Sequence, residues 1–172
     1  MTQRGTIYCL DSNCLVEAWN KYYSPDFCEG YWEVLAELGR RKVIFLPEKV
    51  QEEIFKKDDT LKKWLQKTRL PVKAIDVSVQ ECLKAIFAKD PNHRRLVDSS
   101  KRRSEADPWV IAHAINEKAV VVTKEDRNAD VASPRVKIPN VCDAMGVRWI
   151  SDFDFIRETN IKFSSELRPP PK

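Results

Sequence analysis

Five acidic residues, far apart in a chain of 172 residues, are the side chains with the clearest capacity for chemistry. They are Asp11, Glu53, Asp107 and the neighbours Glu125 and Asp126. Carboxylates that come together repel one another, so they destabilise the fold unless a cation lies between them. Mg²⁺ or Mn²⁺ takes oxygen ligands and needs only one or two carboxylates. Such ions activate water and neutralise charge on a phosphate that is being cleaved, so the acids predict a Mg²⁺ or Mn²⁺ site for phosphate chemistry.

Three of these acids follow segments that we expect to be strands. Residues 6–10 and 119–122 are short, apolar and rich in β-branched or aromatic side chains, which is typical of buried strands. Asp11 directly follows the first strand, and Glu125 and Asp126 follow the second. The carboxyl ends of parallel strands meet at one edge of a sheet, where ligands bind. We therefore expect these acids at a common edge.

Two helices would supply the other acids. A helix begins at Pro47, and its apolar residue Val50 marks the buried face. At 100° per residue, Glu53 lies about 60° from Val50, whereas Glu52 lies about 160° away and faces water. Asp107 stands in the first turn of another helix, where the helix dipole favours a carboxylate. Glu53 and Asp107 are thus the acids expected to point inward.

The order of elements predicts the fold class. Further strand-like segments occur at 43–46 and 147–150, with helical patterns between the strands. This alternation predicts a three-layer α/β fold with a central parallel sheet of about four strands and helices on both faces. We expect one domain over residues 6–163, after an N-terminal extension of residues 1–5 and before a disordered, proline-rich tail of residues 164–172.

Composition excludes several other classes of protein. The four glycines are too far apart for a phosphate-cradling loop, and the two histidines form no HExxH motif. The five cysteines form no C-x-x-C pair and are read as reduced, mostly buried thiols of a cytoplasmic protein. The apolar runs are shorter than the ~20 residues of a membrane span, so no membrane partner is expected. The net charge of +4 permits a polyanionic partner without requiring one.

Each acid also has a purely structural explanation when taken alone. Asp11 could cap the first helix, Glu53 could be a solvated helix residue, and Asp107 could be an ordinary first-turn acid. Glu125 and Asp126 could be turn residues. Taken together, the acids favour a catalytic or metal-binding role, because every one of them falls at the same end of its strand–helix unit.

Five motifs carry a resemblance to a known family. They comprise residues 7–13 (IYCLDSN), 50–54 (VQEEI), 106–112 (ADPWVIA), 121–125 (VVTKE) and 137–142 (KIPNVC). In this order they resemble the PIN-domain superfamily, and in particular a PIN-like branch of bacterial and archaeal proteins similar to VapC-type toxin ribonucleases. The resemblance spans roughly residues 6 to 163.

The resemblance implies a Mg²⁺- or Mn²⁺-dependent endoribonuclease that hydrolyses RNA and acts as the toxin of a toxin–antitoxin pair. Asp11, Glu53 and Asp107 match the first three acids of the family. Glu125 stands where many PIN domains carry an aspartate, with Asp126 beside it and Asp143 as a more remote candidate. The implied partners are RNA, an antitoxin protein and a second copy of the chain.

Residues around the acids could orient or steer a substrate. Neutral hydrogen-bonding side chains flank the acids, namely Ser12, Asn13 and Thr123. The basic segment 89–103 is expected to be an exposed connector, and its Arg102 and Arg103 could draw RNA phosphates toward the site. A mobile, solvated loop or an antitoxin docking surface would explain the same charges.

Two rival functions remain open at this stage. The glutamate at position 125 favours a PIN-like module that binds RNA or protein without cleaving RNA. A phosphotransfer enzyme with Asp11 as nucleophile, as in haloacid-dehalogenase-like hydrolases, would carry a second aspartate where this chain has Asn13. A response-regulator receiver is disfavoured because no paired acids precede the first strand.

Overall fold

A five-stranded parallel sheet forms the centre of the described molecule. The structure is a computed structural model that describes residues 5–57, 59–97, 105–130, 133–167 and 169. Within these residues the strand order is β3-β2-β1-β4-β5, and every neighbouring pair is parallel. The strands are β1 (Tyr8–Leu10), β2 (Ile44–Pro47), β3 (Val72–Lys73), β4 (Val120–Val122) and β5 (Trp149–Ile150). The predicted fold class is confirmed, and the two-residue strand β3 brings the expected count of about four to five.

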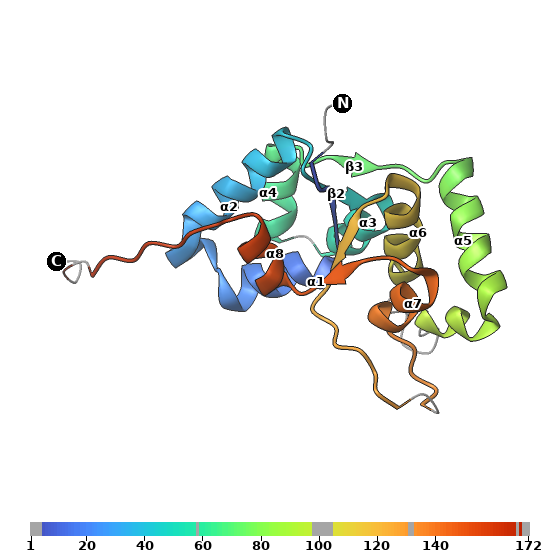
Figure 1. Cartoon of the computed structure of the whole chain (residues 1–172). Helices are drawn as coiled ribbons and strands as arrows, with labels where there is room; N and C mark the ends of the chain where they lie inside the picture. Colours follow the sequence, from blue (N-terminus) through green and yellow to red (C-terminus); the bar gives the residue numbers. More distant parts are fainter. Residues whose placement is uncertain (1–4, 58, 98–104, 131–132, 168, 170–172) are drawn as a thin grey trace.

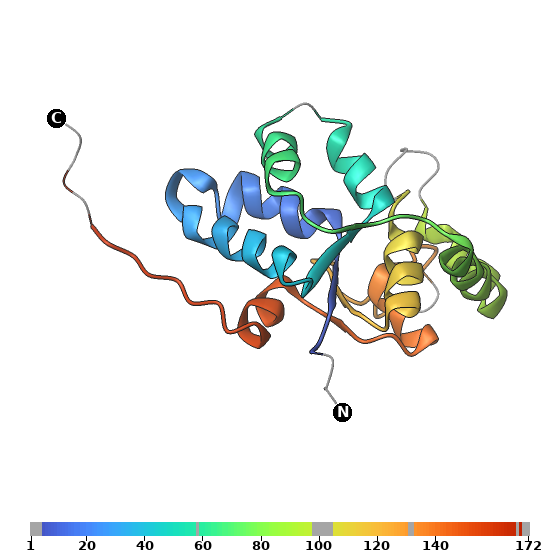
Figure 2. The same ribbon diagram turned by 90° about the horizontal axis from the view of Figure 1, so that it is seen from above.

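Helices cover both faces of this sheet. They are α1 (Ser12–Glu17), the π-helix η1 (Ala18–Tyr22), α2 (Pro25–Arg40), α3 (Glu48–Phe55), α4 (Thr60–Thr68), α5 (Val77–Lys89), the 3₁₀-helix η2 (Pro91–Leu96), α6 (Asp107–Glu117), α7 (Ile138–Met145) and α8 (Asp152–Glu158). Helices α5, α6 and α7 lie on one side of the sheet, and α1, α2, α4 and α8 lie on the other (Figures 1 and 2). The three-layer arrangement follows from this division.

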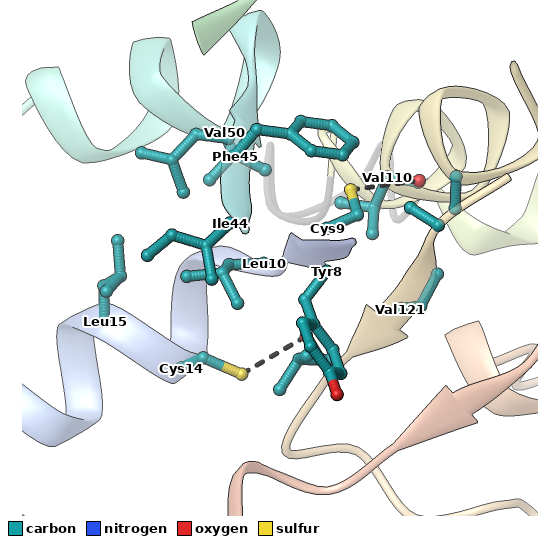
Figure 3. Packing of buried hydrophobic residues seen from close by; sticks show 14 of the residues in the cluster. Tyr8, Cys9, Leu10, Cys14, Leu15, Ile44, Phe45, Val50, Val110 and Val121 are labelled. Carbon is teal, nitrogen blue, oxygen red and sulfur yellow. Dashed lines mark hydrogen bonds between the residues drawn. The ribbon is translucent and has the colours of Figure 1, made fainter. Parts of the chain in front are cut away.

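The central strand β1 shows how the two layers are attached. Its side chains alternate between the faces, as in any strand. The Tyr8 ring packs edge-on against Phe155 of α8, with the ring centroids 5.1 Å apart. The Cys9 thiol points the other way and donates to the carbonyl of Val110 in α6, at 3.5 Å (Figure 3). Because β1, β2 and β4 are buried along their whole length, both faces of the central strands contribute to the core.

Part of the basic segment 89–103 is regular structure, which the sequence analysis did not predict, although Arg94 and Arg95 are exposed as expected. Residues 91–96 form η2, in which His93 and Leu96 are buried. The His93 ring nitrogen Nδ1 lies 2.8 Å from the carbonyl oxygen of Ile86. A 3₁₀-helix repeats every three residues, so it leaves no pattern of period 3.6 in the sequence. Arg102 and Arg103 lie outside the described residues.

Three expectations from the sequence concern the C-terminal tail, membrane spans and the cysteines. Residues 164–167 and 169 have no regular secondary structure and are exposed. No helix in the described ranges has the length and apolar character needed to cross a membrane. All five cysteines are free thiols, and Cys9, Cys14 and Cys142 are buried.

His113 of α6 is buried against the sheet without a polar partner. The side chain is 0% exposed, and neither ring nitrogen has a hydrogen-bond partner among the described residues. Burial lowers the pKa of His113, and the charge of Lys73 acts in the same direction. The acids Glu117, Asp76 and Glu48 only partly offset this decrease. The folded state therefore binds a proton at His113 less readily than the unfolded chain does.

We expect His113→Leu to stabilise the protein by about 1–3 kcal/mol at neutral pH, because it removes unsatisfied buried polar atoms. Since the pKa is lowered on folding, the stability contributed by His113 is lost as the pH drops below about 6.5, so the stability advantage of the variant over the wild type should grow at acid pH. Thermal unfolding at about pH 7 and about pH 5 measures both effects. The control His93→Gln keeps His113, so its stability difference from the wild type should not grow at acid pH; a difference for His113→Leu that stays constant with pH would contradict this explanation.

Candidate active site

Asp11 is fixed at the carboxyl edge of the sheet between two strands. Its backbone N–H donates to the carbonyl of Val122 at the end of β4, at 3.0 Å. Its own carbonyl accepts the N–H of Cys14 at 3.1 Å, and this hydrogen bond closes the first turn of α1. The Asp11 side chain is 1% exposed and makes no capping hydrogen bond to α1. A simple capping role therefore does not explain this carboxylate.

Thr123 connects Asp11 to Glu125. The Thr123 hydroxyl donates to Oδ2 of Asp11 at 3.1 Å and accepts the backbone N–H of Glu125 at 3.2 Å. Ser12 adds a longer contact, 3.5 Å from its Oγ to Oδ1 of Asp11. Thr123 is 0% exposed, so this hydroxyl is fixed within the core. Two of the three neutral residues predicted to orient groups at the site, Ser12 and Thr123, thus contact the two carboxylate oxygens of Asp11.

The carboxylate of Glu125 lies at the start of α7. Its Oε2 accepts the backbone N–H of Ile138, the first residue of that helix, at 2.8 Å. The first N–H groups of a helix have no partner within it and carry a partial positive charge, so they favour a carboxylate. This bond fixes the position of Glu125 relative to Thr123.

Glu53 faces inward from α3, whereas Glu52 does not, as the helical spacing predicts. Oε2 of Glu53 is buried and has no hydrogen-bond partner in the described part of the chain. Glu52 is exposed and pairs with Lys49 at 2.6 Å. Glu53 lines a small pocket of about 110 Å³ together with Ser12, Asn13, Val16, Ile54, Lys57 and Asp59. An unpartnered carboxylate oxygen in such a place has room for a ligand.

The charges of the neighbouring acids act on Asp11. Burial of the carboxylate, together with the negative charges of Glu125 and Glu53, raises the pKa of Asp11 to about 7. The hydrogen bonds from Thr123 and Ser12 lower this pKa but do not outweigh the burial and the charges. The site therefore holds more negative charge than its hydrogen bonds can stabilise.

Asp107 approaches the same edge from α6, on the face of β1 that carries Cys9 and Asp11. It is the first residue of α6 and is buried at 9% exposure. The contact between Cys9 and Val110 gives a reference point from which positions along β1 and α6 can be compared. From this contact, Asp107 lies three residues along α6, about 4.5 Å, toward the carboxyl edge, and Asp11 lies two residues along β1, about 6.6 Å, in the same direction. Asp11 and Cys9 also share a face of β1, because side chains of a strand alternate.

The remaining predicted residues are either exposed or not described by the structure. Asp126 and Asn13 are exposed, and Arg102 and Arg103 fall outside the described residues. Among the residues described, no three acidic, histidine or cysteine side chains lie close enough together to hold one metal ion. The oxygen ligands, the unpartnered Glu53 oxygen and the raised pKa of Asp11 nevertheless fit a hard divalent cation in their chemistry.

Comparison with known proteins gives the family. Residues 8–163 match the family described as Domain of unknown function (DUF4411). The chain belongs to this family. No curated protein matches this DUF4411 chain. It is similar to a chain in the crystal structure of VapBC2 from Rickettsia felis bound to a DNA fragment from their promoter, with 18% identity and a TM-score of 0.50 over 85% of this chain and 98% of that chain. This likeness confirms the predicted PIN-like three-layer fold.

Sequence reasoning missed an ion pair beside the site of this DUF4411 protein. Nζ of Lys124 lies 2.6 Å from Oδ2 of Asp152, and both side chains are largely buried. Burial alone would lower the pKa of Lys124, but the hydrogen bond and charge of Asp152 outweigh it and raise that pKa. Asp152 follows β5 much as Asp11 follows β1. The criterion that identified Asp11, an acidic residue just after a strand, also fits Asp152. The sequence does not indicate which residue would pair with it.

In metal-free DUF4411 protein, we expect Asp11→Asn to be more stable than the wild type at alkaline pH. The raised pKa means that the folded state binds the Asp11 proton more tightly, so the contribution of Asp11 to wild-type stability falls as the pH rises from about 4 to about 7. A shift of this size corresponds to about 4 kcal/mol. The Tm difference between variant and wild type should widen by about 5 to 10 °C between about pH 5 and about pH 8.

Thermal melts in a chelator measure this difference, and Asp126→Asn is the matched control. Asp126 is exposed, so its substitution should leave the pH dependence unchanged. A Tm difference for Asp11→Asn that is constant with pH would show that Asp11 carries no such penalty.

Proposed function

We propose that this protein is a Mg²⁺- or Mn²⁺-dependent endoribonuclease that hydrolyses RNA phosphodiester bonds and acts as the toxin of a toxin–antitoxin pair in the cytoplasm. The observation that carries the proposal is the Asp11 carboxylate, buried at the carboxyl edge of the sheet with its pKa raised by burial and by Glu125 and Glu53. A protein gains nothing in stability from such an arrangement, which is typical of a functional site.

Each residue has a distinct role in this proposal. Asp11, Asp107 and Glu125 would hold the ion, with Asp126 as a further oxygen ligand, and Glu53 would complete the acidic cluster. When bound, the ion would supply activation of water and neutralisation of the charge on the scissile phosphate. Thr123 and Ser12 orient the Asp11 carboxylate through their hydroxyl groups.

Groups outside the acidic cluster would bind the substrate. Asn13 borders the small pocket beside Glu53 and presents an amide to a phosphate oxygen or a water. Arg102 and Arg103 would attract RNA phosphates from the segment that precedes Asp107. Binding through these cations would weaken with increasing salt, because it releases counterions from the RNA.

The similarity to a VapBC2 chain supports the toxin–antitoxin part of the proposal. That complex was solved on a DNA fragment from its own promoter. For the present chain we propose an antitoxin protein as partner and a homodimer as the assembled form. Size-exclusion chromatography with light scattering, alone and with the product of an adjacent small gene, tests both.

Cleavage of RNA tests the enzymatic proposal. We expect the wild type to cleave single-stranded RNA with added Mn²⁺, and Asp11→Asn and Asp107→Asn to lose activity by at least about 100-fold, since removing charge-stabilising groups costs factors of this order. Glu53→Gln should lower the rate, whereas Glu52→Gln on the same helix should not, because Glu52 is exposed and paired with Lys49. Undiminished cleavage by both aspartate variants would refute the proposal.

A non-catalytic PIN-like module is the alternative, favoured by the absence of three gathered metal ligands among the described residues. The two functions differ in metal binding. The enzyme should bind Mn²⁺ in isothermal titration calorimetry and lose that binding in Asp11→Asn. A module would instead bind RNA in a salt-sensitive manner that is independent of divalent ions.

A further inference from the structure

Residues 123–125 leave β4 with their side chains on alternate sides. Thr123 and Glu125 belong to the Asp11 side through the two hydrogen bonds of the Thr123 hydroxyl. The Lys124 side chain points to the other side and pairs with Asp152 at the start of α8. One short segment therefore joins the acidic site to a separate charged contact.

The contact of Lys124 is unusual among the ion pairs formed between described residues. Its two side chains are 14% and 8% exposed, whereas every other such pair has at least one side chain that is 37% exposed or more. The ammonium group also lies over the ring of Tyr22, 4.4 Å from its centroid, and 5.5 Å from that of Phe153. These rings, each about half exposed, shield the pair from water.

Shielding of this kind makes the position of Lys124 specific. A lysine on an exposed turn keeps its side-chain freedom and gains little from a neighbouring acid. A buried lysine must keep its partner, because loss of one member leaves an uncompensated charge. Displacement of Lys124 is therefore costly, and it would also displace Thr123 and Glu125, whose Cα atoms are each about 3.8 Å away.

We propose that Lys124 is a positioning residue, whose buried ion pair with Asp152 holds residues 123–125 so that Thr123 and Glu125 stay directed toward Asp11. The catalytic importance of this role rests on the proposed ribonuclease function. The positioning itself is a property of the metal-free protein and can be measured without RNA or metal.

Amide hydrogen exchange, measured by NMR in a chelator, tests the positioning. Two reporter amides belong to the site: the N–H of Glu125, bonded to Thr123, and the N–H of Ile138, bonded to Glu125. In Lys124→Met both should exchange about tenfold faster or more, relative to amides of β1. Uniform acceleration of all amides would instead indicate general destabilisation and would overturn the proposal.

A double variant separates positioning from stability. Lys124→Met combined with Asp152→Ala removes both buried charges, so overall stability should recover toward that of the wild type. The two reporter amides should nevertheless stay fast, because the segment is no longer anchored. If the double variant restores their protection, Lys124 has only a structural role. This variant also decides the question should Lys124→Met fail to fold.

Arg148→Met is the matched control. Arg148 pairs with Glu158 at the far end of α8, so its loss weakens the same helix without touching residues 123–125. Both reporter amides should keep their protection in this variant, and acceleration equal to that in Lys124→Met would overturn the proposal.

Cleavage and Mn²⁺ affinity are measured in parallel. Under the proposed function, the double variant should bind Mn²⁺ about tenfold more weakly than the wild type. If the wild type neither binds Mn²⁺ nor cleaves RNA, the proposed function fails, while the exchange rates still decide the role of Lys124.

Discussion

The burial of the Asp11 carboxylate is the constraint to which the surrounding structure responds. A charged carboxylate removed from water must be compensated by hydrogen bonds or by opposite charge. This protein supplies hydrogen bonds from the Thr123 hydroxyl and the Ser12 backbone, and then adds the negative charges of Glu125 and Glu53. Among the described residues, the neighbours that govern the pKa of Asp11 include no cation. The unfavourable charge is therefore left for a ligand to compensate.

The register of the sheet brings these groups together. Leu10 pairs with Val122 across the parallel strands β1 and β4, so the next residue on each strand, Asp11 and Thr123, also meet. A shift of one residue would reverse every side chain of a strand. Such a shift would place Lys124 opposite Asp11 and neutralise the carboxylate. The apolar packing of β1 between α6 and α8 fixes the register, and in this way the core determines the electrostatics of the site.

Much of this arrangement could be predicted from local patterns in the sequence. A strand's length and apolar character locate its end, which is why Asp11 and Glu125 could be selected. The angle between Glu53 and Val50 depends only on helical geometry, so the inward acid could be distinguished from Glu52. The 3₁₀-helix η2 has no such signal, and the bond from Ile138 to Glu125 depends on where a distant helix begins.

The partner of Lys124 could not be predicted, because it depends on how β4 and β5 align. Thr123 donates its N–H to Ile150 at 3.1 Å, which brings the residues after both strands to the same level. Only this alignment places Asp152 within reach of Lys124. The neighbouring strand thus provides the counter-ion, and the sequence alone contains two separate charged residues with no sign that they meet.

The alternation of side chains after β4 separates the buried cation from the buried acids. Lys124 is one residue from Thr123 and one from Glu125, yet its charge is committed to Asp152 on the other side of the strand. Had Lys124 paired with Asp11, the fold would have gained a compensated ion pair and lost the negative pocket. The chain instead pairs its lysine with a second acid and leaves Asp11 to neutral hydrogen-bond donors from Thr123 and Ser12. This division is what a protein needs if an external cation is to occupy the acidic side.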